Sequence, residues 1–171
     1  MRGARSVAVL AFGLGALAFA RIPAKHFALF ERDSADFRRI IAPISKAPRL
    51  LYLVFDHGGT TRLVSPWVHL PAWVQADRGG WLSFHFALFG ASPIRYRNDE
   101  DAVVPPSPPV RWEWEPDRFD AKNQAFGYDW FLVRSAESPD ALFAPDETIV
   151  PVAHDGWWWL YRREGGGERE R

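Results

Sequence analysis

Residues 49–56 read RLLYLVFD, a continuous apolar run that ends in a carboxylate. An apolar run without alternating polar positions is typical of a strand that is buried on both faces, as in a parallel sheet. The turn His57-Gly58-Gly59 follows at its carboxyl end, which is where open α/β sheets place their ligand sites. The stretch therefore predicts an α/β domain and makes Asp56 and His57 candidate site residues.

Further helices and strands are expected on both sides of this run. The spacing of apolar residues predicts a helix over 25–44 and another over 66–78. Alternation predicts a second strand over 81–89, and YDWFLVR predicts a third over 128–134. Short helical segments are expected within 117–124 and 138–143, and the acidic, proline-rich residues 98–109 are expected to form a surface loop.

A C-terminal hairpin is the clearest local signal. Residues 149–154 and 157–162 flank Asp155-Gly156, a dipeptide that favours a two-residue hairpin turn. Pro151 has no N–H to donate, so the first hairpin strand is expected at a sheet edge. The order of elements predicts a layered α/β domain with a mixed, partly parallel sheet and an antiparallel hairpin at one edge.

The N-terminal segment, residues 1–24, is hydrophobic. Two arginines precede the uncharged run SVAVLAFGLGALAFA at 6–20, which ends in the small-x-small form of a signal-peptidase site. Both a signal peptide cleaved after Ala20 and a retained membrane anchor formed by 6–20 fit this pattern; a buried helix of a soluble protein fits it less well. The first two place the following domain on the extracytoplasmic side of a membrane.

Composition describes one globular domain over 25–163, followed by a charged tail over 164–171 that we expect to be disordered. Of the 171 residues, 47% are hydrophobic and 25% charged, which suits a chain that buries a core. The formal net charge is zero, which argues against a nucleic-acid partner because phosphate binding needs a basic face. The chain has no cysteine, so disulfides and cysteine-based zinc sites are excluded.

No sequence motif specifies a cofactor, a metal or a reaction. The histidines at 57, 69, 85 and 154 lack the short spacings of zinc ligands, and the glycine pairs do not form a nucleotide-binding loop. We therefore expect neither a metal nor a cofactor.

An enzyme that acts on carbohydrate is one alternative, with Asp56, His57, Asp129 and Arg95 as its catalytic candidates. Glycoside hydrolysis needs two carboxylates across the scissile bond, and Asp56 and Asp129 are both expected near strand ends. The simpler expectation for Asp129 is an ion pair with an arginine.

A secreted carbohydrate-binding module is a second alternative. The chain has nine tryptophans, and exposed aromatic rings stack on sugar faces. Trp112 and Trp114 follow the proline-rich loop and are expected on one face of an extended segment. In the hairpin, alternation puts Trp157 and Trp159 on one face and Trp158 on the other. Core packing is the simpler expectation for these rings.

Five stretches, taken in order, carry a resemblance: RLLYLVFDHGG, SPWVHLPAWVQADRGGWLSFHFA, SPIRYR, YDWFLVR and VAHDGWWWLYRR. Together they resemble the soluble extracytoplasmic C-terminal region of bacterial polytopic membrane proteins similar to lipid-linked-sugar glycosyltransferases of the protein-mannosyltransferase type. The resemblance covers residues 33–163. The positions that match are His69, Trp73, Arg78, Gly79, Gly80, Pro93, Arg95, Tyr128 and Asp129.

The membrane-spanning part that carries the catalytic acids of such transferases is missing from this chain. The resemblance therefore implies a non-catalytic extracytoplasmic accessory domain, whose partner is a polytopic membrane protein or a glycan. It also favours retention of residues 6–20 as an anchor, because in that pattern the domain follows a last membrane span. His69, Arg78, Trp112 and Trp114 are the candidate ligand-binding residues.

Overall fold

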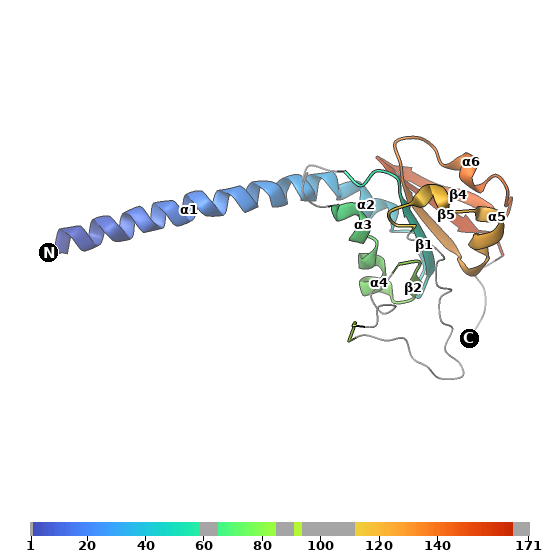
Figure 1. Cartoon of the computed structure of the whole chain (residues 1–171), viewed down its shortest axis with the longest axis horizontal. Helices are drawn as coiled ribbons and strands as arrows, with labels where there is room; N and C mark the ends of the chain where they lie inside the picture. Colours follow the sequence, from blue (N-terminus) through green and yellow to red (C-terminus); the bar gives the residue numbers. More distant parts are fainter. Residues whose placement is uncertain (1, 59–64, 85–90, 94–111, 166–171) are drawn as a thin grey trace.

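The computed structural model describes residues 2–58, 65–84, 91–93 and 112–165. Its first element, α1 (Arg2–Asp33), is one helix of 32 residues that extends away from the rest of the molecule (Figure 1). The helix runs through Pro23, so the hydrophobic segment and the first part of the helix expected over 25–44 are continuous. Within the described part of the chain, no helix combines the length and apolar character that crossing a bilayer requires.

The remainder of the expected helix over 25–44 is a separate short helix, α2 (Ala35–Ile40). The chain turns at Ser34, whose N–H still donates to the carbonyl oxygen of Phe30 at 2.9 Å. The turn places Phe37 and Ile40 against the sheet, where both are at most 2% exposed. Burial of these side chains decides the direction of α2, because a straight continuation of α1 would leave them in solvent.

A five-stranded sheet confirms the predicted fold class. Its order is β2-β1-β3-β5-β4, with β1 parallel to both β2 and β3, and β5 antiparallel to both β3 and β4. The hairpin therefore lies at one edge, and β4, which carries Pro151, is the edge strand as predicted. The strands are β1 (Arg49–Val54), β2 (Trp81–Leu82), β3 (Trp130–Arg134), β4 (Ile149–Asp155) and β5 (Trp158–Arg163).

Strand β1 is buried on both faces, as its sequence predicts. Leu50, Tyr52 and Val54 belong to one hydrophobic core, and Leu51 and Leu53 belong to another on the opposite face of the sheet. All five are at most 1% exposed. Each fully buried leucine stabilises the fold by about 1.5–3 kcal/mol, so this strand is a main source of stability.

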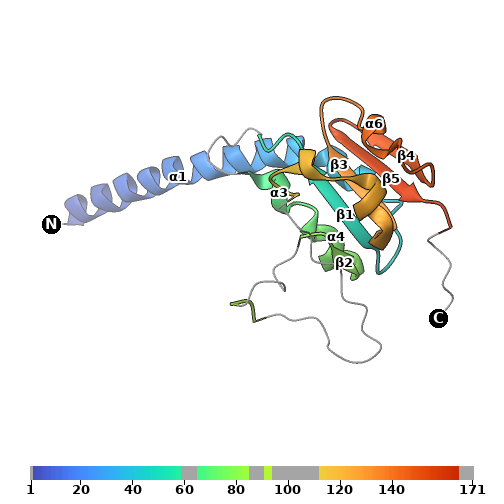
Figure 2. The ribbon, with the colours of Figure 1, turned by 45° about the vertical axis from the view of Figure 1, so that its right-hand side comes forward.

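Different helices cover the two faces (Figure 2). The first core is covered by α2 together with α3 (Pro66–His69) and α4 (Ala72–Arg78). The second core is covered by shorter segments, which are η2 (Pro116–Arg118), α5 (Ala121–Gln124), η3 (Ala125–Gly127) and α6 (Asp140–Phe143). The chain therefore passes from one face of the sheet to the other between β2 and β3.

Several expected elements differ in extent. The helix expected over 66–78 is divided because Pro71 cannot donate the hydrogen bond that would continue α3. The helix expected within 117–124 is two separate segments, η2 and α5, while α6 lies within the segment predicted for it. Of the strand expected over 81–89, only Trp81–Leu82 forms, and 85–89 lie outside the described residues, as do the loop over 98–109 and the tail beyond 165.

The hairpin turn lies one residue later than predicted. Asp155 pairs with Trp158, so the two loop residues are Gly156 and Trp157. Gly156 has φ +58, a conformation that favours glycine. Alternation along β5 holds, since Trp158 packs into the first core and Tyr161 into the second.

Candidate functional site

Asp129 is held in an ion pair at the start of the parallel strands. Strands β1 and β3 are in register from Leu50 opposite Trp130, which places Arg49 beside Asp129. Arg49 Nε donates to Asp129 Oδ2 at 2.7 Å, and Arg49 Nη2 donates to the other carboxylate oxygen. The hydrogen bond to Asp129 raises the pKa of Arg49. The predicted pairing of Asp129 with an arginine is confirmed.

The four enzyme candidates do not form a site among the described residues. Asp56 follows the carboxyl end of β1, so the whole strand separates it from Asp129. His57 Nε2 lies 2.9 Å from the carbonyl oxygen of Glu113, and its ring packs 5.2 Å from that of Trp114. Arg95 lies outside the described residues. The carboxylate pair that glycoside hydrolysis needs is therefore not assembled by Asp56 and Asp129.

The first two ligand-binding candidates lie on α3 and α4. His69 is exposed on α3, with its ring 5.9 Å from that of Phe84. Arg78 Nη1 donates to the carbonyl oxygens of Ala42 and Ile44, and so joins the end of α4 to the segment before β1. Its contacts are those of a residue that stabilises the fold.

The other two candidates, Trp112 and Trp114, lie in a turn, and the expectation of an extended segment with both rings on one face is wrong. Trp112 is 3% exposed and packs against Phe119 with ring centroids 5.2 Å apart. Trp114 is 43% exposed. The burial of Trp112 in the second core separates the environments of the two rings, so they do not form a common platform.

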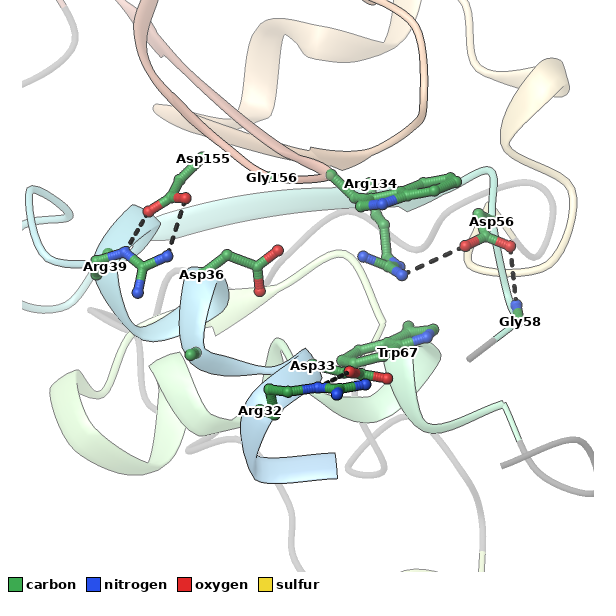
Figure 3. Close-up of a pocket in the computed structure, with 12 residues that line it drawn as sticks. Arg32, Asp33, Asp36, Arg39, Asp56, Gly58, Trp67, Arg134, Asp155 and Gly156 are labelled. Carbon is green, nitrogen blue, oxygen red and sulfur yellow. Dashed lines mark hydrogen bonds and ion pairs between the residues drawn. The ribbon is translucent and has the colours of Figure 1, made fainter. Parts of the chain in front are cut away.

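A cleft of about 640 Å³ lies instead at the carboxyl ends of β1 and β3 (Figure 3). It is bounded by the junction of α1 and α2, the residues after β1, and the hairpin loop. Because the connections around β1 cover opposite faces of the sheet, this is the position at which open α/β sheets leave a crevice for ligands. The charged and aromatic residues that line it are Arg32, Asp33, Asp36, Arg39, Asp56, Trp67, Arg134, Asp155 and Trp157.

Arg134, the last residue of β3, is the central side chain of the cleft. Its side chain is only 6% exposed, and Nη2 lies 3.3 Å from Asp56 Oδ2. Its Nε and Nη1 are buried and have no hydrogen-bond partner. The guanidinium carbon lies 4.2 Å from the ring centroid of Trp67 and 5.3 Å from that of Trp157. Arg134 is therefore a buried cation that lies against aromatic rings and retains two unused donors.

Carboxylates surround this cation. Burial lowers the pKa of Arg134, whereas the charges of Asp56, Asp36 and Asp33 oppose that effect. Asp36 Oδ1 accepts the N–H of Phe37 at 2.8 Å. Figure 3 shows Asp36 and Asp56 on opposite sides of the Arg134 guanidinium.

The remaining charges of the cleft form ion pairs with one another. Arg39 Nη2 donates to Asp155 Oδ1 at 3.0 Å, with a second contact through Nε, and this arginine holds the pKa of Asp155 below its usual value. Arg32 Nε lies 3.3 Å from Asp33 Oδ1. Three arginines face four aspartates, which leaves the lining one negative charge in excess.

Of the residues that line the cleft, Asp56 was a candidate from the sequence, whereas Arg134, Trp67 and Asp36 were not. One available signal was that YDWFLVR, like RLLYLVFD, is an apolar strand that ends in a charged residue. When two such strands are parallel neighbours, their charged ends meet at the same edge of the sheet. Asp36 carried no comparable signal, because it lies on an ordinary polar position of a helix.

No family model, curated protein or solved structure matches the chain. The resemblance to the C-terminal region of membrane transferases therefore stays a prediction. Among the residues that the structure describes, no group of three or more histidine, aspartate or glutamate side chains is placed to hold a metal ion.

Proposed function

We propose that this chain is a non-catalytic accessory domain, held at a membrane by α1 on the extracytoplasmic side and associated with a glycosyltransferase-like membrane protein. The observation that carries the proposal is the apolar surface of α1. Eight large hydrophobic side chains between positions 7 and 22 are 60–80% exposed: Val7, Val9, Leu10, Phe12, Leu14, Leu17, Phe19 and Ile22. A helix that is apolar all round is typical of a membrane environment, and a patch of this size needs a cover.

The course of α1 supports retention of the hydrophobic segment in the mature protein. The helix continues without a break beyond Ala20, where a signal peptidase would cut, as far as Asp33. Its last turns are joined to the domain, because the ring of Phe30 stacks on that of Trp67 with centroids 5.6 Å apart. The apolar surface of α1 and its continuity with the domain support attachment of the domain to a membrane.

The contacts in the domain support a role without catalysis. Asp129 is committed to Arg49, Asp155 to Arg39, and Asp56 to Arg134. A general acid or base needs a proton-accepting group in reach of substrate and a pKa near the working pH. The oxygens of these carboxylates are in contact with arginine donors, so they are poorly placed to take a proton from a substrate.

The proposal is tested by fractionation of cells that express the full chain. We expect the protein in the membrane pellet after a high-salt wash, and its release by detergent. Replacing Leu10 and Leu14 by arginine should move most of the protein to the soluble fraction, because charge is costly in an apolar environment. Phe126→Arg is the matched control: Phe126 is 75% exposed on the domain itself, so this variant should stay in the pellet.

Mass spectrometry and protease accessibility complete the test. We expect a mature chain that retains residues 6–20 and a domain that is digested when protease is added outside intact spheroplasts. A mature chain that begins at Arg21 would replace the anchor with a cleaved signal peptide. A protected domain in a soluble cytoplasmic fraction would refute the proposal.

A further inference from the structure

We infer that the cleft at the carboxyl ends of β1 and β3 binds a neutral carbohydrate. The inference rests on the proposed function only for the location of the domain, and it assigns a ligand class to a cleft centred on Arg134, which was not a candidate from the sequence. Three observations carry it: two unused buried donors, a balance of charge that disfavours ions, and an exposed aromatic ring at the rim.

The two unused donors are Nε and Nη1 of Arg134. A buried donor without an acceptor is unfavourable, so a ligand oxygen that reaches either nitrogen contributes to the affinity. Asp36 supplies the complementary group, because a carboxylate only accepts hydrogen bonds. A ligand that uses both residues must accept and donate at neighbouring atoms. Sugar hydroxyl groups have this property.

The balance of charge selects against ionic ligands. An anion at Arg134 would compete with Asp56, which is already 3.3 Å away, and would approach Asp36 and Asp33. A cation would meet Arg134 itself and the arginines that pair with Asp33 and Asp155. A neutral polyol avoids both penalties and still forms hydrogen bonds to charged groups, which are stronger than those between neutral groups.

The aromatic ring is that of Trp157, which is 44% exposed in the hairpin loop, at the rim of the cleft. The apolar C–H face of a pyranose packs on exposed aromatic rings. Trp67, on the floor of the cleft, is 1% exposed and packs on Arg134, so it positions the guanidinium and is not available for stacking. A volume of about 640 Å³ is within the ordinary range for small-molecule sites.

The test uses the full chain in nanodiscs of phosphatidylcholine, which avoids detergents with sugar headgroups. The probes are methyl glycosides of glucose, mannose and galactose with their disaccharides, and glucuronate and glucose 6-phosphate as anionic comparisons. Binding is followed by saturation-transfer NMR and calorimetry. We expect at least one neutral sugar to bind and the anions to bind at least tenfold more weakly.

Two substitutions in the cleft and one control outside it identify the site. Trp157→Ala and Asp36→Asn should each weaken sugar binding by about tenfold, which corresponds to the loss of one favourable contact of about 1.4 kcal/mol. Trp73→Ala removes another exposed ring, 61% exposed on α4 and outside the cleft, and should leave binding unchanged.

Three outcomes would overturn the inference: no binding by any neutral sugar, stronger binding by the anions, or equal effects of Trp157→Ala and Trp73→Ala. The result is separable from the fate of the proposed function. A chain that fractionates with membranes but binds no sugar would refute only the ligand. A chain that binds sugar but is soluble in the cytoplasm would refute only the location.

Discussion

Replacing Arg134 by methionine should stabilise the folded protein while it removes sugar binding. Methionine is unbranched and flexible, so it packs against the rings of Trp67 and Trp157 without a charge, with a chain that ends one atom short of the guanidinium carbon. The substitution leaves Asp56 without its partner, but that carboxylate is 36% exposed and stays hydrated. It therefore avoids the usual penalty of breaking a buried pair, which is an uncompensated buried charge.

The magnitude follows from the contacts of Arg134. Removing two unpartnered buried donors gains about 2–6 kcal/mol, at about 1–3 kcal/mol each. The loss of the cation–π contact with Trp67 costs about 2 kcal/mol, and the loss of the partly exposed ion pair costs at most about 1 kcal/mol. The sum of these effects is an increase of about 1 kcal/mol in the free energy of unfolding, which raises Tm by about 2–4 °C for a chain of this size.

The assay is urea unfolding at pH 7, followed by tryptophan fluorescence, with Arg49→Met as the matched control. Arg49 uses both of its bonded nitrogens on Asp129, whose side chain is only 18% exposed, so its loss leaves a poorly hydrated carboxylate. Arg49→Met should therefore lower the free energy of unfolding by about 1–3 kcal/mol. If Arg134→Met loses as much as Arg49→Met, Arg134 is a structural residue and the reasoning from its unused donors fails.

Two further predictions concern the turn before β2 and the acid limit of stability. Gly80→Ala should lower the free energy of unfolding by about 2–4 kcal/mol, because the φ of Gly80 is +76 and a Cβ would collide with the backbone of Pro48. Gly79→Ala, at φ +71 with open space around it, should lower it only by the backbone strain of about 1–3 kcal/mol. Equal losses of the two variants in thermal unfolding would contradict the collision. The hydrogen bond from Thr148 lowers the pKa of Asp146, so its contribution to stability is present above the unfolded pKa of about 3.9 and is lost as pH falls through the lower folded pKa. In Asp146→Asn, Tm should fall less steeply below about pH 4 than in the unmodified protein. An unchanged dependence of Tm on pH would refute the contribution of Asp146.

Sequence patterns predicted the parts of the fold that depend on local chemistry. The apolar runs that became β1 and β3, the edge position of the strand with Pro151, and the pairing of Asp129 with an arginine were all confirmed. Each follows from a property that a short segment carries by itself, such as continuous apolarity or a missing N–H.

The cleft depends on contacts between distant segments and could not be read in the same way. Arg134 and Asp56 are 78 residues apart, and they meet only because β1 and β3 pair in parallel. The environments of Trp112 and Trp114 likewise depend on a turn whose geometry is set by the second core. The break at Ser34 was hidden because the apolar spacing over 25–44 continues across it.

The unbroken course of α1 has a geometric consequence for the domain that it carries. Each residue of an α-helix adds about 1.5 Å of length and about 100° of rotation. Because α1 runs from the apolar segment to Asp33 as one helix, the number of residues between them sets both the distance of the cleft from the apolar segment along the helix axis and its orientation around that axis. Inserting one residue after Arg21 would rotate the cleft about the helix axis by about 100° with almost no displacement along that axis. Inserting seven residues would move it by about 10 Å along the axis and restore nearly its original orientation.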